Sequence, residues 1–340
     1  MMPQICLVPR LEGLGGMVSF QAKFILGLQR QNIPFTFNLS DPANTAILVI
    51  GGTRQLYALQ RARRQGVRIV QRLNGMNWLH KVEKTPLRAA LRAEINNRIL
   101  AFIRRRLADR IVYQSIFSRD WWDRVYGERT IPNQVVYNGI DLERYSPDGP
   151  ETPPADHFRI LLVEGHLTGG YARGLETAVR MAQAVRDQHQ LSVELMVVGD
   201  VDDDLKARAH TLAPQLWITW QGVVSRDDIP ALDRAAHVLF SADLNAACPN
   251  SVIEAMACGL PVVAYDTGAL GELVRDGAGE VVPYGADYWQ LEEPDIPRLA
   301  TACARILTDN FPYRERARMR AESTFDLNAM TQAYLEALIS

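Results

Sequence analysis

The second half of the chain contains a predicted helix start with a carboxylate one turn inside it. Residues 236–240 form an apolar run, which indicates a buried strand, and small and polar residues follow as far as Asn250. Ser251 and Glu254 have the spacing of a capping box. The N–H groups of a helix start attract phosphate, and the carboxylate of Glu254 can accept hydrogen bonds from both hydroxyls of a ribose. The stretch therefore predicts either a nucleotide site or an ordinary strand-to-helix loop with a capping box.

A glycine-rich turn near the start of the chain offers similar chemistry. It lies between a predicted strand at 5–8 and a predicted helix that begins at Met17. Gly15 and Gly16 allow the backbone to approach a phosphate closely, although the G-x-G-x-x-G spacing of a dinucleotide fold is absent. The alternative is a plain tight turn.

A long string that starts at Pro249, PNSVIEAMACGLPVVAYDTGALGELV, resembles the nucleotide-binding signature of the family 4 (group 1) retaining glycosyltransferases. The resemblance implies an α/β chain with the GT-B fold, in which two Rossmann-like domains with doubly wound parallel sheets face a central cleft. In that family two glutamates flank seven residues. Glu254 matches the second, which implies that it holds the nucleotide ribose, whereas Ala246 replaces the first, which is credited with the donor sugar. The residues expected beside Glu254 in the nucleotide site are Asn250, Ser251 and Val252.

The resemblance also implies two cations that neutralise the donor pyrophosphate, after a predicted strand at 159–163. Arg173 stands where the family has a lysine, His166 stands where it has an arginine, and this chain has extra residues at 169–170 between them. Arginine can bind phosphate in bidentate fashion, whereas histidine is a cation only when protonated. In the family the backbone of the region around 217–224 receives the nucleobase, so the resemblance implies that Val223 or Val224 stacks on the base. A surface charge on a helix is the alternative role for Arg173.

The loop after a predicted strand at 67–70 supplies candidates in the first half. Arg72 and Asn74 would lie beyond the carboxyl end of this strand, where α/β sheets bind ligands, so both are candidate sugar or phosphate contacts. The family often has a histidine or an aspartate in this region, which makes His80 a catalytic candidate by resemblance. The alternative for His80 is a structural role, which is the commoner one for a lone histidine.

The chain has 340 residues, which is enough for two domains. We predict an N-terminal, acceptor-side domain at 1–150 and a nucleotide-sugar-binding domain at 151–322, with a proline-rich and acidic linker at 146–156. Strands and helices alternate, which predicts parallel sheets. The resemblance implies that a last helix, at about 323–340, crosses back to complete the first domain.

Composition and charge exclude several classes of function. The formal net charge is −2, which gives no overall attraction to nucleic acid. The four cysteines form no C-x-x-C pair and have no histidines at metal-ligand spacing, so we expect a reducing, cytoplasmic setting and neither a metal nor a cofactor beyond the nucleotide-sugar co-substrate. Asp200 and Asp202 form a D-x-D, but the acidic run continues into a predicted helix, which is typical of a helix start. No apolar run is long enough to span a bilayer.

A basic amphipathic segment at 81–110 has two interpretations. Its apolar residues share one helical face, and lysines and arginines supply the charge. The favoured interpretation is a domain helix whose apolar face packs in the core. The alternative is a helix on the inner membrane face that brings the enzyme to a lipid-linked acceptor. The apolar residues are Leu87, Leu91, Ile95, Ile99, Phe102 and Ile103.

The resemblance implies a metal-independent, hexosyltransferase-type glycosyltransferase. It would move a sugar from a nucleoside-diphosphate donor to a hydroxyl of a carbohydrate or lipid-linked acceptor, with retention of configuration. Its predicted catalytic residues are Arg173, Glu254 and His80. Two alternatives stay open. One is a nucleotide-sugar-binding protein without catalysis, which Ala246 and His166 favour, and the other is a different GT-B enzyme, such as a sugar-nucleotide epimerase.

Overall fold

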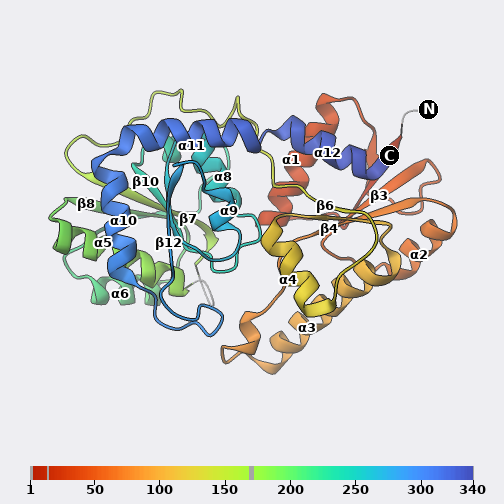
Figure 1. Cartoon of the computed structure of the whole chain (residues 1–340), viewed down its shortest axis with the longest axis horizontal. Coiled ribbons are helices and arrows are strands. Elements are labelled where there is room, and N and C mark those ends of the chain that lie inside the picture. The colour runs from red at the N-terminus through yellow and green to blue at the C-terminus, as the bar shows by residue number, and fades with distance from the viewer. Residues whose placement is uncertain (1–2, 14, 168–171, 340) are drawn as a thin grey trace. The chain divides into compact units, whose positions relative to one another are not determined.

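The computed structural model describes residues 3–13, 15–167 and 172–339, which form two compact units (Figure 1). Unit 1 consists of Met1–Gly139 and Asp326–Ser340, and unit 2 consists of Ile140–Phe325. In the described residues each unit contains a six-stranded sheet whose paired strands are parallel. These two parallel sheets with their helices confirm the predicted fold class.

The sheet of unit 1 has helices on both faces. Its order is β2-β1-β3-β4-β5-β6, and its central strands are apolar and buried, as is typical of a parallel sheet between two helical layers. One face packs against α1 and α12, and the other packs against α2 and η2. The strands are β1 Gln4–Val8, β2 Phe35–Thr36, β3 Asn44–Ile50, β4 Arg68–Leu73, β5 Arg110–Tyr113 and β6 Asn133–Val135. The helices are α1 Gly16–Arg30, α2 Leu56–Arg64, η1 Leu79–Lys81, α3 Leu87–Phe102, η2 Ile103–Leu107, α4 Ile116–Tyr126 and α12 Leu327–Ile339.

The last helix of the chain, α12, supplies part of the core of unit 1. The ring of Tyr334 packs against the rings of Phe20 and Phe24 from α1, with centroids 5.2 and 5.4 Å apart. Gly27 of α1 lies so close to α12 that a Cβ at this position would be 2.0 Å from the Oγ1 of Thr331. Figure 1 shows the two helices side by side.

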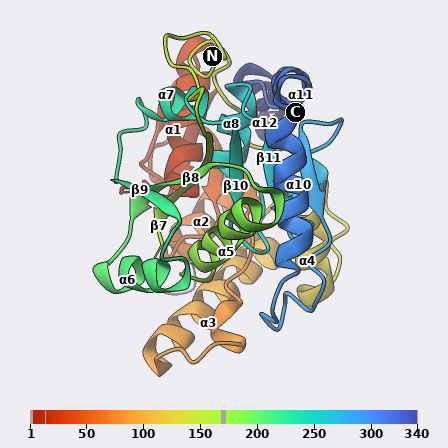
Figure 2. The same cartoon turned by 90° about the vertical axis from the view of Figure 1, so that its left-hand side faces the viewer.

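The sheet of unit 2 has the order β12-β11-β10-β7-β8-β9. Numbered from β7, this is the order 3-2-1-4-5-6 of the Rossmann fold. The helices α5 and α10 lie side by side on one face of the sheet (Figure 2) and bury its apolar core. The strands are β7 Phe158–His166, β8 Val193–Asp200, β9 Trp217–Gly222, β10 Val238–Ser241, β11 Val262–Tyr265 and β12 Gly279–Val282. The helices are α5 Ala172–His189, α6 Asp203–Leu212, α7 Ile229–Arg234, α8 Asn250–Ala257, α9 Leu270–Leu273, α10 Ile296–Thr308 and α11 Asn310–Thr324.

The apolar face of the basic segment is not packed in the core. In α3, Leu87 is 84% exposed, Leu91 is 59% exposed and Ile95 is also exposed, and of this helix's residues only Asn97 is buried. The favoured interpretation is therefore wrong for Leu87, Leu91 and Ile95, whereas Ile99, near the end of α3, packs against the core of unit 1. Polar contacts also anchor the helix, because the side chain of Asn97 exchanges hydrogen bonds with the backbone of Asn77. Further along the segment, Ile103 of η2 is buried as expected.

Arg72 lies inside a strand rather than in a ligand-binding loop. The strand β4 extends to Leu73, so the predicted strand end was too early. Arg72 is 1% exposed, its Nη2 donates to the Oδ1 of Asn138 at 3.0 Å, and its guanidinium lies 3.7 Å from the ring centroid of Phe20. The prediction that Arg72 contacts a sugar or a phosphate is wrong, because these contacts hold its side chain within the core of unit 1.

No helix among the described residues is both long enough and apolar enough to cross a membrane.

Candidate functional site

The Rossmann order of unit 2 identifies one point of its sheet where a ligand is expected. The strands β7 and β10 are parallel neighbours, with Val238 opposite Ile160. From β7 the chain continues to β8 on one side, and from β10 it continues to β11 on the other. Between two such strands the connecting loops diverge at the carboxyl ends and leave a crevice, in which α/β proteins bind ligands. We call this edge, formed by the ends of β7 and β10 and the loops that follow them, the switch-point edge.

The helix α8 begins at this edge and carries Glu254. It starts at Asn250, directly after Pro249 in an extended conformation, and within the described chain no side chain caps it. The predicted capping box is therefore wrong. The helix starts earlier than expected, so Ser251 lies in its first turn and not at its cap. The backbone N–H groups of Asn250, Ser251 and Val252 form the first turn of a helix without a side-chain cap, which is the geometry that binds an anion.

Glu254 lies one turn into α8 and is partly exposed. Burial, followed by the negative charge of Glu254, raises the pKa of the Tyr145 hydroxyl. The same two causes raise the pKa of Asp233, a fully buried carboxyl of α7, well above its usual value. The carboxylate of Glu254 therefore lies near the Tyr145 hydroxyl and the Asp233 carboxyl, and its charge helps to keep both protonated.

A second pair of carboxyl groups lies at the switch-point edge itself. Glu164 is near the end of β7, and Asp243 follows the end of β10 by two residues. Burial raises the pKa of Glu164 to about 8, with a contribution from the charge of Asp243, and burial raises the pKa of Asp243 to about 7. The pair therefore retains a proton near neutral pH, so it repels an anionic ligand less than two carboxylates would.

From the sequence we predicted neither the Glu164–Asp243 pair nor the raised pKa of the buried Asp233 carboxyl. The sequence places each residue near a strand or helix end, but it does not state which strands are neighbours. The signal was available in the alternation of strands and helices, because the Rossmann order makes β7 and β10 adjacent.

Arg173 lies at the start of α5, close to the switch-point edge. The next residue, Gly174, approaches the loop after β10, because a Cβ on it would be 2.8 Å from the Cβ of Ala242. Burial raises the pKa of Tyr284, and the positive charge of Arg173 partly opposes this. The buried Nε of Arg173 has no hydrogen-bond partner in the described part of the chain. The extra residues at 169–170 lie outside the described residues.

The other two unit 2 candidates lie at the same edge of the sheet. His166 is the last residue of β7, and its Nδ1 is 3.3 Å from the Oδ2 of Asp200, with both side chains exposed. Val223 follows β9, is 58% exposed, and stands two strands away from β7. The structure thus brings Glu254 and Arg173 to the loops after β10 and β7, and it places Val223 further along the edge.

The aspartates of the D-x-D sequence do what the pattern of a helix start predicts. The Oδ1 of Asp202 accepts a hydrogen bond from the N–H of Leu205 at 2.9 Å and caps α6, and two further aspartates lie in the first turn. No group of three or more His, Cys, Asp or Glu side chains that could hold a metal ion occurs among the described residues.

In unit 1 the glycine-rich turn leads directly into a helix. Gly15 precedes α1 with a φ of 121°, a conformation that favours glycine, and Gly16 is the first helical residue. No described atom lies within 4 Å of a Cβ built on Gly15, so the backbone there is open to a ligand. Leu14 lies outside the described residues.

Asn74 and His80 have different surroundings. The carbonyl oxygen of Asn74 accepts a hydrogen bond from the Nε1 of Trp122 at 2.7 Å, while its buried Oδ1 has no partner among the residues that the structure describes. The Nε2 of His80 is 2.8 Å from the Oε1 of Glu94 in α3, and the His80 side chain is largely buried. The hydrogen bond from His80 lowers the pKa of Glu94. This contact holds η1 to α3, which favours the structural role of His80.

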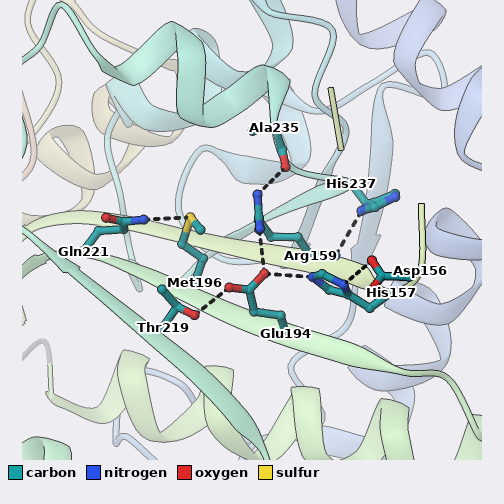
Figure 3. Close-up of polar contacts among 9 residues, drawn as sticks. All are labelled: Asp156, His157, Arg159, Glu194, Met196, Thr219, Gln221, Ala235 and His237. Carbon is teal, nitrogen blue, oxygen red and sulfur yellow. Dashed lines mark hydrogen bonds and ion pairs between the residues drawn. The ribbon is translucent and has the colours of Figure 1, made fainter. Parts of the chain in front are cut away.

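A polar network lies at the opposite end of the unit 2 sheet (Figure 3). The buried carboxylate of Glu194 accepts hydrogen bonds from the Oγ1 of Thr219 at 2.5 Å and from the Nε of Arg159 at 2.6 Å. Although burial opposes ionisation, these contacts hold the pKa of Glu194 below its usual value. Since the network joins the amino ends of β7 and β8, it stabilises the sheet away from the switch-point edge.

Comparisons with known proteins agree with this fold. Residues 159–309 match the family model described as "Glycosyl transferases group 1". A D-inositol 3-phosphate glycosyltransferase from Salinispora arenicola is 32% identical over 173 residues, which are 45% of this chain and 39% of that protein. A glycogen synthase from Mycobacterium tuberculosis is 27% identical over 244 residues, which are 68% of this chain and 55% of that protein. The chain spans between 38% and 42% of the length of the first three curated relatives that it matches.

Two solved structures match nearly the whole chain. HepE from Anabaena, in complex with UDP and glucose, has a TM-score of 0.69 and 18% identity, with 99% of each chain covered. WaaG, a glycosyltransferase involved in lipopolysaccharide biosynthesis, has a TM-score of 0.71 and 14% identity, with 99% of this chain and 100% of WaaG covered. At these identities the likeness shows the fold. Residues 159–309 therefore resemble the group 1 glycosyltransferases, and the whole chain has the two parallel sheets of the GT-B fold that HepE and WaaG have.

Proposed function

We propose that the chain transfers a sugar from a nucleoside-diphosphate donor to an acceptor hydroxyl, with retention of configuration and without a metal. One observation carries this proposal. Glu254 lies one turn inside α8, a helix with no side-chain cap in the described chain, at the switch-point edge of a Rossmann sheet. This arrangement offers helix N–H groups to a phosphate and a carboxylate to a ribose.

Each predicted site residue has a role in this proposal. Glu254 binds the ribose hydroxyls, and the first N–H groups of α8 bind a phosphate. Arg173 stabilises the charge that develops on the diphosphate leaving group, and within unit 1 Gly15 and Gly16 offer the first N–H groups of α1 to an anionic group. The supporting residues are His166 as a second, pH-dependent cation, Val223 against the base, and Asn74 on the acceptor side in unit 1, where His80 holds η1 against α3.

The role of Glu254 is tested by Glu254→Gln. This change keeps the shape of the side chain and removes the charge that binds two hydroxyls, so we expect the donor KM to rise by about tenfold or more. The measurement is sugar transfer or donor hydrolysis across a series of donor concentrations. The matched control is Glu315→Gln, a surface substitution on α11 that should leave both constants unchanged. Unchanged kcat and KM in Glu254→Gln would remove this residue from the site.

The donor is identified by thermal shift against UDP, GDP, ADP and TDP and their glucose conjugates. UDP is the first to test, because HepE was solved with UDP and glucose. A ligand at about a hundred times its Kd stabilises the folded protein by roughly 2.7 kcal/mol, which is a shift of a few degrees. Binding without turnover in any acceptor assay would favour the non-catalytic alternative that Ala246 suggests, and epimer formation without an acceptor would favour an epimerase.

We further propose that α3 contacts an anionic membrane, from which a lipid-linked acceptor would be reached. The exposed residues Leu87, Leu91 and Ile95 recur every fourth position, which places them on one face of the helix, and the exposed cations Lys84, Arg88 and Arg92 lie among them. Apolar side chains beside cations match a surface of acyl chains and anionic headgroups.

Vesicle flotation tests this contact. The wild-type chain should float with vesicles that contain phosphatidylglycerol and not with vesicles of phosphatidylcholine alone. The double variant Leu87→Ser/Leu91→Ser should lose about tenfold or more of this binding, since two buried leucines supply several kcal/mol. Tyr57→Ser is the control, because Tyr57 is exposed on α2 of the same unit. Equal flotation of the double variant and the wild type would contradict the proposal.

A further inference from the structure

The loop between β10 and α8 contains a buried amide that nothing in the described chain satisfies. Asn245 is 5% exposed, and neither its Nδ2 nor its Oδ1 has a hydrogen-bond partner among the described residues. Its φ is 61°, in the left-handed region that asparagine tolerates better than most residues. Buried polar atoms are almost always hydrogen-bonded. A side-chain amide whose nitrogen and oxygen both lack partners therefore points to a group that is absent from the free protein.

The backbone around Asn245 is held firmly by the turn after β11. A Cβ on Gly268 would lie 2.8 Å from the carbonyl carbon of Asn245 and 2.6 Å from the N and O atoms of Ala246. The N–H of Ala269 donates to the carbonyl oxygen of Ala246 at 2.8 Å. The amide is thus presented by a fixed loop, and its position does not depend on a flexible segment.

Two hydroxyls at the same edge are also unpartnered. The Oγ of Ser241, at the end of β10, and the Oγ1 of Thr267, in the turn that holds the loop, are buried and have no partner in the described part of the chain. Asn245, Ser241 and Thr267 all lie at the carboxyl ends of the neighbouring strands β10 and β11, and we call these three residues the orphan cluster. Within this cluster, Asn245 lies five residues before the start of α8. The cluster lies beside the switch-point edge.

The chemistry of the orphan cluster selects its ligand. An amide offers one acceptor and two donor hydrogens, and each serine or threonine hydroxyl can donate and accept. A phosphate would satisfy the donors alone, and an ammonium group would satisfy the acceptors alone. The hydroxyl groups of a sugar both donate and accept, so they can satisfy every member of the cluster.

Position 246 cannot supply this contact. In the resemblance described above, the first of two glutamates is credited with the donor sugar, and this chain has Ala246 there. Ala246 is 4% exposed, and its backbone is closely packed against Gly268. Its methyl group carries no polar atom, whereas the preceding residue carries an unsatisfied amide.

We propose that Asn245 binds hydroxyl groups of the donor sugar and thereby takes over the recognition that residue 246 cannot provide. This inference rests on the proposed function, since it assigns the sugar part of the same donor. Ser241 and Thr267 offer further hydrogen bonds to the hydroxyl groups of the same sugar.

Two variants separate sugar recognition from structure. Asn245→Gly removes the amide and accepts the positive φ, and Asn245→Asp keeps the shape but replaces the donor with an acceptor. The control is Gln190→Gly, which removes an exposed amide at a similar positive φ of 56° in the same unit, after α5. Calorimetry measures the Kd of UDP and of UDP-glucose for each protein, and the other diphosphates and their glucose conjugates are used if uridine does not bind.

We expect both Asn245 variants to weaken binding of the nucleotide sugar by roughly tenfold and to change the Kd of the free diphosphate by less than about twofold. The control variant should bind both ligands as the wild type does. A parallel loss of both ligands, or no loss of either, would overturn the assignment of Asn245 while leaving the proposed function standing. If the wild-type chain binds no nucleotide sugar, the proposed function fails and the inference fails with it.

Discussion

The carboxyl groups of unit 2 differ in what their surroundings do to their charge. Glu164 and Asp243 lie together at the switch-point edge with few polar contacts, and burial keeps both protonated to unusually high pH. Glu194 is more deeply buried but accepts three hydrogen bonds, and it stays ionised. Hydrogen bonding, and not depth alone, therefore decides which carboxyl carries charge.

The contribution of the Glu164–Asp243 pair to stability should fall as the pH rises toward 8. The pKa values of Glu164 and Asp243 are about 8 and about 7 in the folded chain, against 4.5 and 3.8 for free groups. Between pH 4 and pH 8 these two groups therefore bind fewer protons in the unfolded chain than in the folded chain, and their contribution to the free energy of unfolding decreases with pH. Melting temperatures at a series of pH values between 5 and 8 measure this slope.

Glu164→Gln should flatten that slope, because the amide does not titrate. Glu315→Gln should keep the wild-type slope. If Glu164→Gln melts with the same pH dependence as the wild type, the carboxyl pair does not hold its proton in the folded state.

At the scale of single residues, the sequence predicted positions within helices better than contacts between residues that are distant in the chain. The role of Asp202 as a helix cap and the position of Glu254 one turn into a helix follow from local spacing, which a sequence contains. Arg72 and Asn245 could not be assigned in the same way. The side chain of Arg72 is held by contacts with Phe20 and Asn138, and the backbone of Asn245 packs against Gly268. All three of these partners are distant in the chain.

At the scale of elements, α1 and α12 of unit 1 pack closely against each other at Gly27. Gly27→Ala would place a methyl group 2.0 Å from the Oγ1 of Thr331, and neither helix can move without disturbing the ring cluster of Phe20 and Tyr334. We expect a loss of about 1–3 kcal/mol, which is typical of overpacking in a core.

Urea unfolding of Gly27→Ala, followed by tryptophan fluorescence of the whole chain, measures that loss. The double variant Gly27→Ala/Thr331→Ala removes the nearest atom and should recover part of the stability. The control is Gly165→Ala, since no described atom lies within 4 Å of a Cβ at Gly165. A stability of Gly27→Ala equal to that of the wild type would mean that the two helices are further apart in solution.

Amphipathic pattern predicted the elements but not always their packing. The helix α2, Leu56–Arg64, buries its apolar residues Leu59 and Ala62 in the core of unit 1. In α3 the same kind of pattern gave the wrong environment. An apolar stripe predicts that one face of a helix packs against an apolar surface. It does not predict whether the core of the same unit provides that surface.

At the scale of the whole molecule, the alternation of strands and helices and one nucleotide-binding string were sufficient to predict two parallel α/β sheets. The division of the chain depends on contacts between its two ends, which periodicity does not contain. The proline-rich stretch at 146–156, which we predicted as the linker, lies inside unit 2, and the chain passes from unit 1 to unit 2 between Gly139 and Ile140.

Removal of α12 should unfold unit 1 selectively. A chain that ends at residue 325 would expose the apolar surface that now faces Leu327, Tyr334 and Leu338, while unit 2 keeps all of its residues. Limited proteolysis should then digest 1–139 rapidly and leave a stable fragment that contains 140–325. A truncated chain in which both units resist protease equally would show that α12 is dispensable for unit 1.

The return of α12 to unit 1 also sets an order of events during synthesis. Unit 2 is continuous in sequence and can fold as soon as Phe325 has left the ribosome, but unit 1 waits for the last residues of the chain. At about 5–20 residues per second, translation of 140–325 keeps the first 139 residues without their final helix for roughly ten to forty seconds. During that interval Phe20 and Phe24 lack their partner Tyr334, so the nascent first half presents an apolar surface that a chaperone can bind.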